Sequence, residues 1–403
     1  MTDIPASHGE KTNWIATFLI CAFTLCTSVC GFFFTVFLKE SHGYSGFQIG
    51  LLTAIQAVCG MLAAFPAGLG NDRFSSRALV GVSLLVMAVT LPAMAGLRLY
   101  PAFAAIYATW ALSISVFRLS LDVQVLKSGH DQGTSRRLGI YHAGRFLGAC
   151  LGTIGTGYLI RKIDFESTLW VVGAASLALL PAVIFLSRTP VGKRKMSDYR
   201  ADLSSREVLL FAGWLFFFCT HWGAELTSYP LFLRTDLRLS LVEMGWYMSA
   251  EYVAITVAVL LSARPIREPE NFRKFVILGL LASGAGMIGV IARPVALSLS
   301  FRVLHGFGDG VMLLVTYLGI SRLFAVERIG GNAGFINLVT MAGLVAGSLF
   351  YGPLGERFGY GLTQWLAGGL ILALSLPFLL LRDPGLPDSQ TLRARGSTGR
   401  ENS

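Results

Sequence analysis

The sequence has 403 residues, of which 54% are apolar and only 14% are charged. A soluble globular protein carries about 25% charged residues, so this chain lacks the polar residues that would cover a core of its size. Its net charge of +10 does not indicate a nucleic-acid partner, because the Lys and Arg residues lie in short segments between apolar runs. These proportions favour a membrane protein over several soluble domains or a secreted disulfide scaffold.

Apolar runs bounded by charged residues, Gly or Pro predict an all-α membrane protein with twelve transmembrane helices. The first run, from Trp14 to Leu38, is too long for a signal peptide and is expected to remain as the first span. The twelve helices are expected near residues 14–38, 47–69, 79–97, 101–126, 138–160, 168–187, 208–233, 241–262, 274–292, 296–321, 331–354 and 362–381.

The six cysteines lie inside these apolar runs and form no CxxC pair. This placement predicts free thiols that pack as small apolar side chains, and it indicates neither a zinc site nor a disulfide framework.

A constant offset of 195 residues relates the two halves of the chain. It aligns Gly148 with Gly343 and Gly152 with Gly347, among other matches. The repeat predicts two pseudo-symmetric six-helix bundles with a substrate site near the midplane between them. We expect five segments: an N-terminal tail (1–13), an N-terminal bundle (14–187), a linker (188–207), a C-terminal bundle (208–381) and a disordered C-terminal tail (382–403).

The distribution of Lys and Arg predicts the orientation. Most of these residues fall in the segments that share a side with both termini, and basic loops stay in the cytoplasm. We therefore expect a multi-pass protein of the cell (inner or plasma) membrane, with both termini, the linker and the tails cytoplasmic.

The segment after the second predicted helix carries Gly68, Asp72, Arg73 and Arg77. An Asp at a helix end that faces basic residues can hold neighbouring helices together and release them when the bundles rock. The segment resembles the loop 2–3 signature of the major facilitator superfamily, although Ser75-Ser76 stands where that family usually has Gly-Arg. The resemblance implies the major facilitator fold and assigns these four residues to a cytoplasmic gate.

Small residues recur every four positions in the fifth predicted helix, at Gly144, Gly148 and Gly152, and again in the eleventh, at Gly343 and Gly347. This spacing lets helix backbones approach closely in lipid, where packing holds helices together. We expect these positions to be helix contacts; a role in flexing a gate is the alternative.

Ionisable residues at membrane depth are the most informative feature, because each costs about 2.5–3.5 kcal/mol at the centre of a span. They should face a partner or a wet cavity. One reading is that they form buried ion pairs that fix helix register. The other is that the second-half group, with two imidazoles and several acids, takes up and releases protons. The nine residues are Arg118, Asp122, Arg145, His221, Glu225, Glu251, Arg302, His305 and Asp309.

This polar set resembles that of the lactose-permease-like proton symporters, a branch that includes sugar, nucleoside and phenylpropionate permeases. Ser249-Ala250-Glu251 and Leu304-His305-Gly306 also resemble that branch locally. The resemblance implies that Asp122 and Arg145 contact substrate and that Glu251, His305 and Asp309 couple protons. We add Arg118, His221 and Glu225 to the candidate substrate site and Arg302 to the proton-coupling site. The His-to-acid spacing of four on the tenth helix, and Gly152 in place of a stacking aromatic residue, depart from the lactose carriers.

The sequence favours a secondary active transporter that moves a small organic solute by alternating access, coupled to protons. Its expected partners are that solute, protons and the lipid bilayer, with no nucleic acid, and we expect a monomer without a cofactor or catalytic residues. A proton-driven exporter of drugs or amphipathic compounds shares the fold and is the main alternative. A divalent-metal carrier built on the His and acid residues, a membrane enzyme and a non-transporting receptor or scaffold are weaker alternatives.

Overall fold

The computed structural model describes residues 6–31, 34, 37–38, 41–44, 46–127, 134–187 and 202–380. Within these ranges the chain is helical apart from turns and short connections. The C-terminal tail expected at 382–403 lies outside the described residues, as does most of the linker expected at 188–207. The expected N-terminal tail is helical from Ala6 onward, so the first helix begins eight residues before the predicted position.

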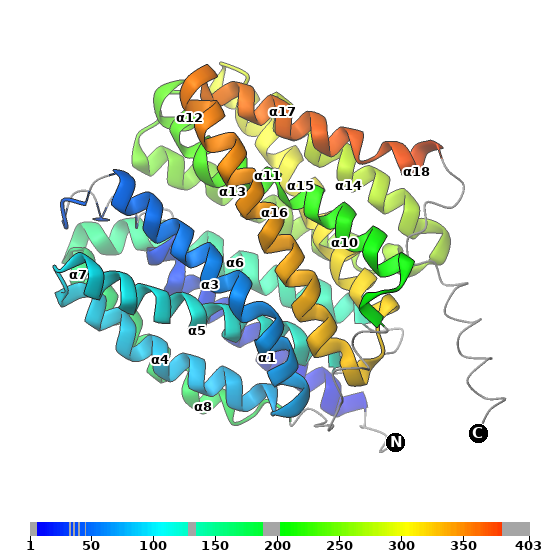
Figure 1. Cartoon of the computed structure of the whole chain (residues 1–403), viewed down its shortest axis with the longest axis horizontal. Coiled ribbons are helices and arrows are strands. Elements are labelled where there is room, and N and C mark those ends of the chain that lie inside the picture. Colours follow the sequence, from blue (N-terminus) through cyan, green and yellow to red (C-terminus); the bar gives the residue numbers. More distant parts are fainter. Residues whose placement is uncertain are drawn as a thin grey trace.

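The first half of the chain forms one bundle, coloured from blue through cyan to green at α8 in Figure 1. Its elements are α1 (Ala6–Thr27) with η1 (Ser28–Cys30), α3 (Gly46–Arg73), α4 (Ser76–Gly96), α5 (Tyr100–Lys127), α6 (Thr134–Ile163), and α7 (Phe165–Ala178) continued by α8 (Leu180–Val183). These helices correspond to the first six predicted spans.

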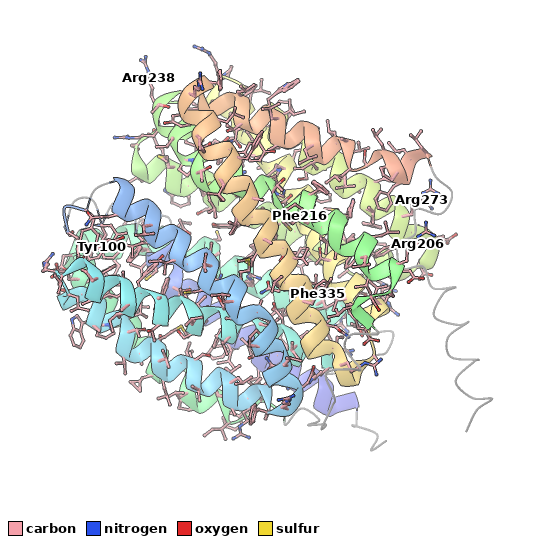
Figure 2. The ribbon with its side chains drawn as sticks, viewed as in Figure 1. Tyr100, Arg206, Phe216, Arg238, Arg273 and Phe335 are labelled. Atoms are coloured by element: carbon pink, nitrogen blue, oxygen red, sulfur yellow. The ribbon has the colours of Figure 1, made fainter. Side chains whose placement is uncertain are left out.

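The second half forms the other bundle, coloured green to red (Figure 1). Its elements are α10 (Arg206–Cys219), α11 (His221–Thr227), α12 (Tyr229–Thr235), α13 (Leu241–Ser262), η2 (Pro265–Arg267), α14 (Pro269–Gly289), α15 (Val295–Leu323), η3 (Val326–Arg328), α16 (Ile329–Phe358), α17 (Tyr360–Ala373) and α18 (Leu376–Leu380). Side chains that the sequence assigns to opposite membrane faces lie at opposite ends of this bundle: Figure 2 shows Arg206 and Arg273 at one end and Arg238 at the other.

Ten segments of the described chain are long and apolar enough to cross a membrane. The two predicted spans outside this set are α3 and α6, with 28 and 30 residues. Both helices form the contact between the bundles, where α3 packs on α16 and α6 packs on α13. The lower hydropathy of α6 follows from this position, because it contributes polar side chains such as Arg145 to the interface between the bundles instead of a lipid-facing surface.

The seventh predicted span is not one continuous helix. It breaks at Thr220 and again at Ser228, which separate α10, α11 and α12. Pro230 follows the second break at the start of α12, where a missing backbone N–H costs nothing. At the first break, Nδ1 of His221 lies 2.5 Å from the carbonyl oxygen of Phe218, so the side chain binds a carbonyl next to the interruption.

The same close contacts between helices occur inside both bundles. On α6, a Cβ at Gly148 would collide with the backbone of Cys21 and one at Gly152 with the backbone of Leu25, both on α1. On α16, a Cβ at the equivalent Gly343 and Gly347 would collide with the backbones of Phe216 and Thr220. Each contact pair is related to its counterpart by the same 195-residue offset. The predicted role of these glycines as helix contacts is confirmed.

Replacing Gly148 by Ala should therefore destabilise the protein. The added methyl group would force α1 and α6 apart, and overpacking of this kind costs about 1–3 kcal/mol. Thermal unfolding of the purified protein in detergent would measure the effect as a lower Tm. Gly155→Ala on the same helix is the control, because nothing lies within 4 Å of a Cβ at that position. Equal Tm values for the two variants would contradict the close contact.

Candidate functional site

Asp72 joins the two bundles at the end of α3. Its carboxylate is buried, with 1% of the residue exposed. One oxygen accepts the backbone N–H of Gly330 at 3.1 Å and the other that of Gly331 at 2.6 Å, at the start of α16 in the other bundle. Lys127, at the end of α5, lies 2.8 Å from the same carboxylate. The free N–H groups of a helix start attract negative charge, so a single aspartate ties three helices together.

The other residues of the predicted gate take different positions. Gly68 touches α16 directly, because a Cβ there would collide with the carbonyl oxygen of Gly330. Arg73 is exposed and Arg77 is partly exposed, and within the described residues neither forms an ion pair with Asp72. Among the described residues, Lys127 on the fourth span is a cation that pairs with Asp72, and sequence reasoning missed it because it is 55 residues away along the chain.

Asp72→Asn should loosen this contact. The substitution weakens two charge-assisted hydrogen bonds and leaves Lys127 buried without its counter-ion, and hydrogen bonds to charged groups contribute about 1.5–3 kcal/mol each. Hydrogen–deuterium exchange should show that the amides of Gly330 and Gly331 exchange at least about tenfold faster.

The exposed Asp236→Asn provides a control of identical chemistry, for which protection at Gly330 and Gly331 should stay unchanged. Unaltered protection in Asp72→Asn would show that the carboxylate does not hold the start of α16.

Six ionisable side chains meet inside the second bundle, and we call them the Arg302 network. Arg302 on α15 is 1% exposed and pairs with Glu225 on α11 and, at 2.5 Å, with Glu251 on α13. Its guanidinium also lies over the ring of Tyr229, 4.3 Å from the centroid. The six members are Arg302, Glu225, Glu251, His221, His305 and Asp309.

The two imidazoles complete the network. Nε2 of His305 lies 3.0 Å from an oxygen of Glu225 and 3.8 Å from one of Asp309. Nε2 of His221 lies 3.1 Å from the same oxygen of Asp309. The other Asp309 oxygen accepts the hydroxyl of Ser283 on α14 at 2.6 Å. Four separate segments, α11, α13, α14 and α15, therefore meet at one buried group of charges.

Hydrogen-bond chemistry fixes the number of protons that this arrangement holds. Nδ1 of His305 lies 2.8 Å from the carbonyl oxygen of Ser283, and Nδ1 of His221 faces the carbonyl of Phe218. A carbonyl only accepts, so both Nδ1 atoms carry hydrogen. Each Nε2 faces a carboxylate oxygen, and two acceptors cannot bond without a proton between them. Each imidazole–carboxylate pair therefore holds one extra proton, on the ring or on the acid.

The charges of the Arg302 network then sum to zero. It contains three carboxylates, of which one is balanced by Arg302 and two by the extra protons in the imidazole–carboxylate pairs. Neutrality matters here because an unbalanced charge in a medium of low dielectric is costly. Loss of either proton would leave a buried negative charge.

Removing Arg302 should be strongly destabilising. Arg302→Met leaves Glu225 and Glu251 buried without their cation, and loss of one partner from a buried ion pair costs about 3–5 kcal/mol. Chemical or thermal unfolding in detergent would measure this. The double variant Arg302→Met with Glu251→Gln should recover part of the loss because it removes one excess negative charge. A single variant as stable as the unmodified protein would contradict the described pairing.

A second polar group, which we call the Asp122 cluster, lies on the first bundle where it meets the second. Asp122 on α5 accepts the hydroxyl of Tyr141 on α6 at 2.8 Å and that of Tyr317 on α15 at 2.5 Å. Arg118 and Arg145 lie close enough to interact electrostatically with it, yet neither forms an ion pair with it in the described part of the chain. The five members are Arg118, Asp122, Tyr141, Arg145 and Tyr317.

The structure groups the predicted site residues differently from the sequence-based assignment. His221 and Glu225, which we assigned to the substrate site, lie with Glu251, Arg302, His305 and Asp309 in the Arg302 network. Asp122, Arg118 and Arg145 lie together in the Asp122 cluster. Sequence reasoning missed Ser283, Tyr141 and Tyr317, because a single Ser or Tyr within a span carries no signal of its own.

The ligand atoms of four network residues could surround a cation by distance alone. They lie within 4.8 Å of one another, and the residues are His221, Glu225, His305 and Asp309. Two facts oppose a metal: both Nε2 atoms already face carboxylate oxygens, and the permanent charge of Arg302 lies against Glu225. The protons described above fit these residues better than a divalent cation does.

Two helical bundles related by an internal repeat, with buried ionisable groups where their helices meet, are typical of membrane transport proteins. The sequence matches the Major Facilitator Superfamily over residues 16–269, and the chain belongs to this family. It is therefore a multi-pass membrane transporter with the major facilitator fold, as the loop motif predicted.

Solved structures with the same fold cover almost the whole chain. The human organic anion transporter MFSD10 (TETRAN) has a TM-score of 0.80 at 16% identity, covering 93% of this chain and 99% of its own. The proton:xylose symporter XylE, bound to 6-bromo-6-deoxy-D-glucose, has a TM-score of 0.77 at 12% identity, covering 97% and 99%. The E. coli fucose:proton symporter FucP has a TM-score of 0.70 at 14% identity, covering 91% and 98%.

The comparison with curated proteins finds no match. The structural neighbours share the fold, and none of them singles out the lactose-permease-like branch, which stays a prediction.

Proposed function

We propose that this protein is a proton-coupled secondary transporter of a small organic solute, with the Arg302 network as its proton-binding site. The observation that carries the proposal is that Nε2 of His221 faces a carboxylate oxygen of Asp309 and Nε2 of His305 faces one of Glu225, contacts that each require an extra proton. The proton symporters for xylose and fucose among the structural neighbours are consistent with it.

Coupling follows from the neutrality of the Arg302 network. While both extra protons are present, the network has no net charge and can remain buried without water. Release of a proton leaves net negative charge, which is stable only where water or a new counter-charge reaches the site. Proton release is therefore favoured in a conformation that hydrates the network from one side of the membrane, which links protonation to alternating access.

We place the end of the molecule that contains Asp72 at the cytoplasmic face, because the basic loops and both termini are expected there. Two close contacts join the bundles at this end: Asp72 binds the start of α16, and a Cβ at Gly139 on α6 would collide with Ala263 after α13. In this interpretation the structure is closed toward the cytoplasm, and breaking the Asp72 contact opens the inner side.

Glu251→Gln should uncouple transport from the proton gradient. The amide keeps the size of the side chain but removes one negative charge from the Arg302 network, which changes the number of protons that neutrality requires. Accumulation in proteoliposomes driven by a pH gradient should fall to the level of equilibration, while exchange of labelled for unlabelled solute across the membrane should remain.

The exposed Glu270→Gln at the start of α14 is the matched control and should keep gradient-driven accumulation. Retained accumulation in both Glu251→Gln and His305→Gln would rule out proton coupling through this network. A symporter moves the solute in the same direction as the protons, whereas a proton-driven exporter moves it in the opposite direction. The same assay therefore separates a symporter from a drug exporter.

A further inference from the structure

The Asp122 cluster has an excess of positive charge that nothing within the described protein neutralises. Two guanidinium groups, Arg118 and Arg145, interact with one carboxylate, Asp122. That carboxylate is already bound by two hydroxyl donors, Tyr141 and Tyr317. The tyrosines stabilise the negative charge of Asp122, and the hydrogen-bond donors of both arginines are left available.

The donors of the two arginines have no protein acceptors in the described residues. Nε of Arg118 is buried and has no hydrogen-bond partner. Arg118 lies 5.9 Å from the ring centroid of Phe23, and Arg145 lies 5.6 Å from that of Phe146. Ring contacts leave the N–H groups of a guanidinium unsatisfied, and a polar group buried without an acceptor is costly.

A third unsatisfied group lies beside the arginines. His142, one residue from Tyr141 on α6, is fully buried, and neither of its ring nitrogens has a hydrogen-bond partner in the described chain. Its ring packs on that of Tyr317, with the centroids 4.4 Å apart, so it belongs to the interface between the bundles. A neutral imidazole offers one donor to a bound ligand.

Apolar and aromatic surface borders these polar groups. Phe146 on α6 and Tyr252 on α13 lie with their ring centroids 6.2 Å apart, across the interface between the bundles. Both side chains are partly exposed, as are Arg118 and Arg145. Arg145 lies beside the ring of Phe146, Arg118 lies close enough to Tyr252 to interact with it electrostatically, and all four side chains keep some accessible surface.

We infer that the transported solute is an organic anion whose charged group binds Arg118 and Arg145 and whose apolar body lies against Phe146 and Tyr252. Guanidinium groups bind carboxylates through two parallel hydrogen bonds, and the excess charge of the cluster selects for a negative ligand. The inference rests on the proposed transport function and names the substrate class for it. A bound anion would neutralise the Asp122 cluster in the same way that protons neutralise the Arg302 network.

Binding of matched anionic and neutral compounds to the purified protein tests this inference. The probes are benzoate, phenylacetate and hexanoate, each compared with its uncharged amide, in thermal-shift and calorimetric titrations. We expect the carboxylates to raise the Tm and the amides to leave it unchanged. Phenyl phosphate and benzenesulfonate, measured in parallel, show which anionic group the arginines prefer.

Arginine variants locate the site. Arg145→Gln and Arg118→Gln should each weaken binding of the best carboxylate about tenfold to a hundredfold, because each removes a charge-assisted hydrogen bond. Arg145→Lys keeps the charge without the planar fork and should retain part of the affinity. Arg136→Gln, an exposed position on the same helix, is the control and should bind as the unmodified protein does.

The outcomes separate this inference from the transport proposal. Stabilisation by the amides as strong as by the acids, no response to any of the five anions, or unchanged affinity in both arginine variants would each overturn the anion site. Glu251→Gln should still bind the carboxylate, since it lies in the other network. Gradient-driven accumulation of an uncharged solute alone would support proton coupling and overturn the anionic substrate.

Discussion

The requirement that a buried charge in a membrane be balanced governs the architecture of this protein. Burial of the Arg302 guanidinium requires an acidic partner, and two acids on different helices, Glu225 and Glu251, pair with it. Arg302 balances only one of these two acids, and Asp309 is a third. The other two negative charges are balanced by the extra protons of the imidazole–carboxylate pairs. One arginine thus accounts for the convergence of α11, α13 and α15, and Ser283 adds α14.

The same requirement is met differently in the two bundles. In the second bundle the acids and bases balance internally, so its charge state changes only when protons enter or leave. In the Asp122 cluster Arg118 and Arg145 outnumber Asp122, and under the inference above a bound anion completes the balance. Tyr317, which donates to Asp122, lies on α15, the helix that also carries Arg302, His305 and Asp309, so the two groups share one helix. This connection offers a physical route by which solute and protons influence each other's binding.

The buried charge of Asp72, at one end of the molecule, is balanced as well. Its carboxylate is stabilised by Lys127 within its own bundle and by two backbone N–H groups of α16 in the other. The second contribution exists only while the bundles touch at this end. Separation of the bundles would expose those N–H groups and the carboxylate to water, and in the proposed transport cycle this is the contact that breaks when the inner side opens.

The sequence by itself determined the twelve spans, the two-bundle repeat and the residues that must find partners, because hydropathy and charge at membrane depth are properties of single positions along the chain. The 195-residue offset even predicted which glycines make equivalent contacts, since a duplicated fold repeats its packing. Only the tertiary structure decided which partners meet. Spacing of four on a helix placed His221 and Glu225 on one face, but only the position of α15 decided that His221 faces Asp309 and Glu225 pairs with Arg302. Lys127, Ser283, Tyr141 and Tyr317 entered the sites from other helices, and contacts between distant segments leave no pattern in a single sequence.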